Sequence, residues 1–187
     1  GGLFLGTGMT QEDVCKRILF HPNSKNIGVM GLATGDTPNT YSGIFTGEQL
    51  SMLFAILSNL TDSIIVDCMS NISPGNDPVA YYALPRAGTV IRTLTADVMG
   101  IEYNTAIMPL TKDNNGDRHI LAVSNYSYMN PLDEMIGQLG DVKYMLPQSA
   151  EIAELFLSGK LFTKCITNDG RSYMNEVASI AKEVSSN

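Results

Sequence analysis

The chain has few basic residues and no cluster of them. Its 187 residues include 12 Lys and Arg against 19 Asp and Glu, which gives a formal net charge of −7. The longest basic run is the pair Lys16-Arg17. Because non-specific binding to nucleic acid depends on clustered cations against phosphates, we expect no direct binding of DNA or RNA by this chain.

Long apolar runs and paired cysteines are also missing, and the first residues do not resemble a signal peptide. No apolar run approaches the roughly 18 residues of a membrane-spanning helix, and residues 1–8 carry no positive charge. Cys15, Cys68 and Cys165 are far apart, and none belongs to a CxxC pair. This usage predicts reduced thiols in a cytoplasmic protein rather than a disulfide framework or a metal site.

Short β-branched runs alternate with helical stretches along the chain. This alternation is typical of an α/β fold in which a mostly parallel sheet lies between two layers of helices. Strands are predicted at 27–33, 63–69, 89–95, 120–124 and 142–146, and helices at 10–20, 46–60, 79–84, 98–110, 132–139, 148–158 and 172–184. Residues 112–118 are predicted to form a polar turn. Since no repeat, low-complexity tract or linker interrupts this order, residues 1–187 are predicted to form a single domain.

Two of the predicted helices begin with the residues of a capping box. Thr10 stands three residues before Asp13, and Thr46 stands three residues before Gln49. In such a pair each side chain binds the backbone N–H of the other residue. These positions therefore fix where the two helices begin.

Polar residues follow several predicted strands, where an open parallel sheet binds its ligands. Asp67 ends an apolar run, so its carboxylate could hold a hydrated Mg²⁺ at the edge of the sheet; alternatively it caps the following turn or helix. Asp97 stands before a predicted helix and is expected to be its N-cap. The Asn125 amide can donate to and accept from a purine edge, or it simply forms a turn. Residues 147–149 follow the last strand.

The sequence contains no phosphate-binding loop of the form G-x-x-x-x-G-K-[ST]. The nearest segment is 2–10, in which glycines precede a helix start. Phosphate binding there would need a lysine to supply charge as well as backbone N–H groups. Because the segment has no lysine, we do not expect it to bind phosphate.

From about Asn26 onward the order of strand ends resembles the distal two-thirds of a MinD/ParA-type ATPase. This family includes septum-placement, plasmid-partition and pilus-assembly (TadZ/CpaE-like) proteins. The matching stretches are the strand 27–33, the helix start 46–50, the apolar strand with its carboxylate at 63–68, the strand and helix start 90–97, the strand end 123–125, and the last strand end with its loop at 145–153. Their order and spacing carry the resemblance.

The resemblance implies a P-loop NTPase-like fold that is incomplete at its N-terminus. It implies that Asp67 is the carboxylate on the metal side, and that Asn125, Pro147, Gln148 and Ser149 contact adenine. ATP and Mg²⁺ would be cofactors of the complete protein, although this chain by itself could lack both. The implied protein is a cytoplasmic homodimer that meets a protein partner of a localisation or partition system.

The chain departs from the family at the segment that would make it an ATPase. The Walker A strand, loop and lysine are missing, and the next strand with its switch carboxylate is expected to be missing too. The chain is thus either a fragment or a degenerate form, and ATP hydrolysis is expected only if a Walker A segment is present in the full-length protein. The place of that central strand must be filled by residues 3–6, by a partner chain or by pairing of the flanking strands, because unpaired buried backbone groups cost free energy.

Two other functions remain open at this stage. The first is a non-catalytic scaffold or localisation domain that keeps the fold without using nucleotide. The second is an unrelated Rossmann-like domain that binds a small molecule. The polar residues at the strand ends favour the MinD/ParA-like interpretation over the Rossmann-like one.

Overall fold

The computed structural model describes residues 8–22, 24–31, 34–35, 45–70, 72–115, 118–127, 129–130, 132–160 and 164–186. The chain divides into two compact units, Gly1–Arg86 and Ala87–Asn187. That residues 1–187 form a single domain stays a prediction. The segment 2–10 lies mostly outside the described residues, as does the proposed strand substitute 3–6. In the described ranges, no helix has the length and apolar character needed to cross a membrane.

The N-terminal unit, Gly1–Arg86, is mainly helical in its described part. Its elements are α1 (Gln11–Cys15), β1 (Leu19–His21), β2 (Ser24–Val29), α2 (Gly47–Leu60), α3 (Pro78–Ala83) and the 3-10 helix η2 (Leu84–Arg86). Both predicted capping boxes are present, at Thr10 with Asp13 and at Thr46 with Gln49. Val14, Leu50 and Leu53 form the buried core of this unit. Helix α2 therefore packs through the apolar stripe that its sequence predicts.

The beginning of the N-terminal unit differs from the prediction. Helix α1 ends at Cys15, where the predicted helix continued to residue 20, and the chain then enters β1. The predicted strand 27–33 is β2, Ser24–Val29, which pairs antiparallel with β1 rather than joining a parallel sheet. Its last predicted residues, 32 and 33, lie outside the described part of the chain. A nearby strand supplies the hydrogen bonds of β2, because β1 is only a short turn away.

The prediction of a buried parallel strand at 63–69 is wrong in this structure. These residues form neither helix nor strand, and Asp67 is exposed. The side chain of Ile65 is 93% exposed. A strand needs a neighbour for its N–H and C=O groups, and the two strands described in this unit pair with each other. The apolar sequence alone therefore does not produce a strand here.

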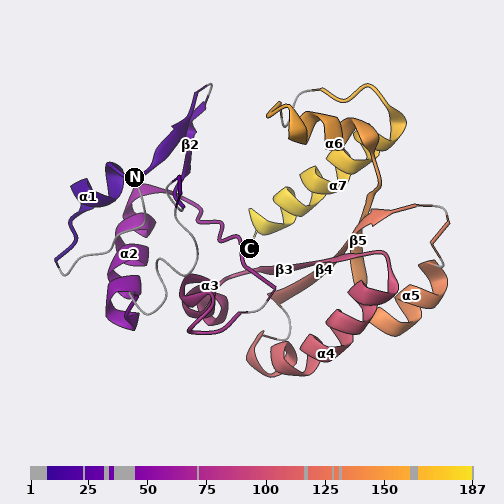
Figure 1. Cartoon of the computed structure of the whole chain (residues 1–187), viewed down its shortest axis with the longest axis horizontal. Coiled ribbons are helices and arrows are strands. Elements are labelled where there is room, and N and C mark those ends of the chain that lie inside the picture. The colour runs from indigo at the N-terminus through magenta and orange to yellow at the C-terminus, as the bar shows by residue number, and fades with distance from the viewer. Residues whose placement is uncertain are drawn as a thin grey trace. The chain divides into compact units, whose positions relative to one another are not determined.

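The C-terminal unit, Ala87–Asn187, is a three-layer α/β structure. Its elements are β3 (Val90–Thr95), α4 (Val98–Asn115), β4 (His119–Tyr126), α5 (Leu132–Leu139), β5 (Val142–Pro147), α6 (Ala150–Leu157) and α7 (Asn168–Val184). The strands pair in the order β3-β4-β5, and both pairings are parallel. Helices α4 and α5 lie on one side of this sheet, and α6 and α7 lie on the other (Figure 1). The predicted fold class is thus confirmed.

The core of the C-terminal unit lies around its central strand. Residues 120–123 of β4 are all buried, as expected for a strand with helices on both faces. Leu94, Leu121, Val123 and Leu139 form the main buried cluster together with Ala96. Helix α4 continues to Asn115, so the polar turn predicted at 112–118 is wrong for residues 112–115, and residues 116 and 117 lie outside the described part of the chain. The loops at the carboxyl edge of the sheet are therefore attached to its buried core.

Candidate functional site

The carboxyl ends of β3, β4 and β5 lie at one edge of the sheet, because the three strands are parallel. The residues at or just beyond these ends are Asp97, Asn125, Asn130, Pro147, Gln148 and Ser149, which together are named the carboxyl rim. Edges of this kind are where open parallel sheets bind ligands. The carboxyl rim is therefore the candidate site of the C-terminal unit.

Asn125 stands in an unusual backbone conformation near the end of β4. Its φ is 58°, the only positive value among the described residues other than glycine. The strand register shifts here, with Ser124 opposite Leu146 and Tyr126 opposite Pro147. Asn125 is thus the additional residue of a β-bulge, and its side chain is exposed. Bulges of this kind redirect a side chain and often lie beside functional sites.

The loop formed by Pro147, Gln148 and Ser149 lies directly against this bulge. Pro147 is buried and pairs with Tyr126, and the Gln148 N–H donates to the Tyr126 carbonyl oxygen at 2.7 Å. The Ser149 hydroxyl oxygen accepts from the Ile152 N–H at 3.3 Å and caps α6. The structure therefore brings Asn125 together with the 147–149 loop, as the sequence predicts.

Asn130 is a carboxyl-rim residue that the sequence prediction missed. Its Oδ1 accepts from the Ser127 N–H at 2.6 Å, and its Nδ2 donates to the Ala96 carbonyl oxygen at 2.6 Å. The side chain thus connects the loop after β4 to the end of β3. The available signal was the dipeptide Asn130-Pro131, which is typical of a turn.

Asp97 caps α4, as predicted. Its Oδ1 accepts from the Gly100 N–H at 2.8 Å. This backbone hydrogen bond holds the pKa of Asp97 below its usual value, and a hydrogen bond with the Thr95 side chain adds to the effect. The Asp97 carboxylate thus already makes hydrogen bonds at the start of α4, with the Gly100 N–H and the Thr95 side chain.

Asp97→Ala is expected to lower the melting temperature by about 5 °C, the usual effect of losing an N-cap in a small domain. Because the folded-state pKa of Asp97 is lowered, the cap stabilises the fold above the unfolded-state pKa. That contribution is lost as the pH falls through the folded-state pKa. Thermal melts of both proteins between pH 7 and pH 2 should therefore converge in acid, whereas a constant difference would contradict the role of the carboxylate.

Comparison with known proteins adds one finding about the fold. No family model and no curated protein matches the sequence. Among solved structures, a ParA family ATPase from Chlorobium tepidum TLS matches with a TM-score of 0.63 and 17% identity. The match covers 82% of this chain and 62% of the ParA family chain. The chain has a ParA-like fold.

The carboxyl rim of this ParA-like fold offers hydrogen-bonding groups and little positive charge. Asn125 and Gln148 each carry an amide that can donate and accept, and both side chains are exposed. The Ser149 hydroxyl accepts the cap bond and keeps its own proton to donate. None of the six carboxyl-rim residues is basic. Such a site can read the polar edge of a heteroaromatic ring, while it lacks a cation for phosphates.

Asp67, the predicted metal ligand, lies in the N-terminal unit, so its place relative to the carboxyl rim stays a prediction. Asp67 does not cap the next helix, because α3 is capped by Asp77, whose Oδ1 accepts from the Ala80 N–H at 2.9 Å; that Asp67 caps a turn stays a prediction. In the described part of the chain, no three His, Cys, Asp or Glu residues cluster as metal ligands. A single exposed carboxylate still fits Mg²⁺, which often takes one or two carboxylates and otherwise waters and phosphates.

Proposed function

We propose that this chain is the nucleotide-side body of a MinD/ParA-like ATPase that positions or partitions a cytoplasmic cargo. The observation that carries this proposal is the left-handed bulge at Asn125, directly beside the 147–149 loop. A strained residue at the carboxyl end of a central parallel strand is typical of a binding site rather than of packing alone. The ParA-like fold supports the same choice.

The carboxyl rim would hold the base of an adenine nucleotide. The Asn125 amide is suited to bind the purine edge, because it offers a donor and an acceptor side by side. Gln148 and Ser149 add further polar groups, and Pro147 fixes the loop through its pairing with Tyr126. Asp67 stays the proposed carboxylate on the metal side of the nucleotide. The proposed assembly is a homodimer, with a protein of the partition or localisation system as partner.

The 187 residues are expected to bind adenine weakly and to hydrolyse no ATP. Phosphoryl transfer depends on positioning and on positive charge from a lysine and Mg²⁺, and the sequence contains no G-x-x-x-x-G-K-[ST] loop. Titration with ATP, followed by amide NMR shifts, should give a Kd of about 1 mM, equivalent to about 4 kcal/mol. A phosphate-release assay on the same sample should stay at background.

GTP provides the matched control for this titration, because it has the same phosphates and a different purine edge. Shifts at Asn125 and Gln148 with ATP but not with GTP would support a base-binding site. Micromolar, Mg²⁺-dependent binding with steady phosphate release would contradict the proposal that these residues lack catalysis.

A non-catalytic scaffold is the second candidate, and exposed apolar residues favour it. Val98 and Met99, at the start of α4, are 68% and 74% exposed, and Met129 is 79% exposed. Met129 precedes Asn130, whose side chain binds the Ala96 carbonyl group, two residues before Val98. Exposed apolar groups of this kind favour a protein partner at the carboxyl rim. If ATP causes no shifts there, the scaffold becomes the better interpretation.

A further inference from the structure

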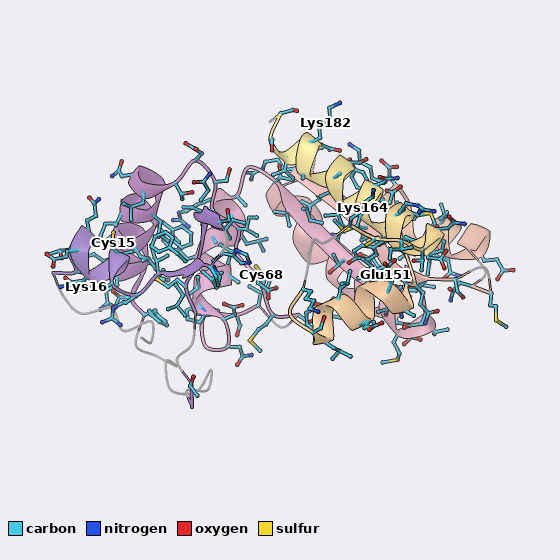
Figure 2. The ribbon with its side chains drawn as sticks, turned by 90° about the horizontal axis from the view of Figure 1, so that it is seen from above. Cys15, Lys16, Cys68, Glu151, Lys164 and Lys182 are labelled. Atoms are coloured by element: carbon cyan, nitrogen blue, oxygen red, sulfur yellow. The ribbon has the colours of Figure 1, made fainter. Side chains whose placement is uncertain are left out.

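The carboxylate of Glu151 binds the start of helix α7. Its Oε1 accepts from the Ile166 N–H at 2.8 Å, and its Oε2 accepts from the Thr167 N–H at 2.9 Å. The Thr167 hydroxyl also donates to Oε2, at 2.6 Å. Glu151 belongs to the first turn of α6, beside α7 (Figure 2). One carboxylate thus joins the first turn of α6 to residues at the start of α7 that lie 15 and 16 positions further along the chain.

A glycine in the first turn of α7 leaves room for the Glu151 carboxylate. Gly170 is buried in the first turn of α7, and a Cβ there would lie well under 3.0 Å from the Glu151 Oε2. Real Cβ atoms essentially never come so close to another atom. The Thr167 hydroxyl accepts from the Gly170 N–H at 3.0 Å while it donates to Glu151. Glycine at position 170 is therefore what lets the carboxylate reach the backbone of α7.

The far end of α7 is attached to β5, the strand that leads into the 147–149 loop. Lys143 Nζ lies 2.6 Å from Oε1 of Glu183, and the Tyr144 hydroxyl donates to its Oε2 at 2.5 Å. Helix α7 thus holds β5 at one end and the first turn of α6 at the other. The 147–149 loop lies between these two attachments.

We infer that Glu151 is a positioning residue for the 147–149 loop and thereby for the base that this loop is proposed to bind. The inference rests on the proposed function, because it concerns the same loop. Only one residue, Ala150, separates Ser149 from Glu151. The hydrogen bonds between Glu151 and residues Ile166 and Thr167 therefore fix the direction in which the chain leaves β5. Glu151 touches no ligand itself and acts through the loop.

Glu151→Gln is the variant that tests this role with the least change in shape. The glutamine keeps one accepting oxygen, but its NH₂ group would face the Thr167 N–H, placing donor against donor. Gly170→Ala tests the same contact by a change in α7. Its added methyl group would displace the Glu151 carboxylate, although Glu151 itself is not mutated. Both variants are expected to speed hydrogen exchange of the Gln148 and Ile152 amides at least fivefold, and to raise the Kd for ATP about fivefold.

Two other glutamates serve as matched controls. Glu154→Gln removes a charge from the same helix, and the Glu154 side chain makes no hydrogen bond or ion pair within the described residues. Glu183→Gln loosens the other end of α7 without touching α6. Measured well below each melting temperature, Glu154→Gln should leave exchange at Gln148 and the affinity for ATP unchanged, and Glu183→Gln should change both less than Glu151→Gln does.

The exchange measurement decides the inference even if nucleotide binding fails. Unchanged Gln148 exchange in Glu151→Gln would overturn it, as would equal loosening in Glu183→Gln, which would show a general effect of α7. If the parent chain shows no ATP shifts while Glu151→Gln still loosens the loop, the positioning role stands and the adenine site is abandoned. Faster exchange combined with an unchanged Kd for ATP would overturn the link between loop and base.

Discussion

Gly100→Ala is expected to lower the free energy of unfolding by about 2–3 kcal/mol, as overpacking in a closely packed site does. A Cβ at residue 100 would lie well under 3.0 Å from the Thr95 carbonyl oxygen, which is a backbone atom at the end of β3. The only relief is to move α4 away from the sheet, which weakens the Asp97 cap as well. Alanine's helix propensity returns only about 1 kcal/mol. Urea unfolding followed by circular dichroism measures the difference.

Gly137→Ala is the matched control, because this glycine also lies in a helix, α5, and no described atom beyond its chain neighbours and the helix's own backbone lies within 4 Å of its added Cβ. It should leave stability unchanged or raise it by up to about 1 kcal/mol. If both variants unfold at the same urea concentration, the close approach of α4 to β3 is not what requires glycine at position 100.

Local sequence signals predicted most of the C-terminal unit. Helix α5 spans Leu132–Leu139, the predicted range, because Asn130-Pro131 marks its beginning and Gly140, at φ 82°, ends it. Strand β5 spans Val142–Pro147, one residue longer than the predicted 142–146, and proline, which cannot donate to the ladder, is its last residue. These elements carry their own start and stop signals, and their apolar faces find partners within the same unit.

The incorrect predictions concern pairing, which a local pattern does not specify. Residues 63–69 have a suitable composition for a buried strand, yet no described strand of their unit pairs with them. Strand β2 was expected in a parallel sheet, but β1 lies close enough to form a hairpin with it. Which strand pairs with a given segment depends on the other strands that the chain forms nearby. For this reason β-rich segments are less predictable than helices.

The candidate site was predicted in part for the same reason. Asn125 and the 147–149 loop stand at the ends of two predicted parallel strands. Because parallel strands end at the same edge of a sheet, the proximity of these residues could be predicted. The bulge at Asn125 could not be predicted, because nothing in the sequence around it distinguishes a residue with positive φ from an ordinary strand end. Asn130 was missed because its function is a contact 34 residues away along the chain, with Ala96.

Asn125→Gly is expected to raise the Kd for ATP at least tenfold while changing stability by less than about 0.5 kcal/mol. Glycine adopts positive φ without strain, so the bulge stays and only the amide is lost. The variant therefore separates two roles that the sequence leaves open, a turn-forming asparagine and a purine contact. The ATP titration by amide NMR, repeated with a urea melt, measures both quantities.

Two further variants at the same position complete this test. Asn125→Asp keeps the shape and tolerates positive φ but cannot donate, so it should weaken binding as much as glycine does. Asn125→Ala has neither the amide nor easy access to positive φ, and should cost about 1 kcal/mol of stability in addition. If Asn125→Gly binds ATP as well as the parent chain, Asn125 only forms the bulge. In that case Gln148 and Ser149 would have to recognise the base without it, and a carboxyl rim with so few remaining groups favours the scaffold over the nucleotide-binding domain.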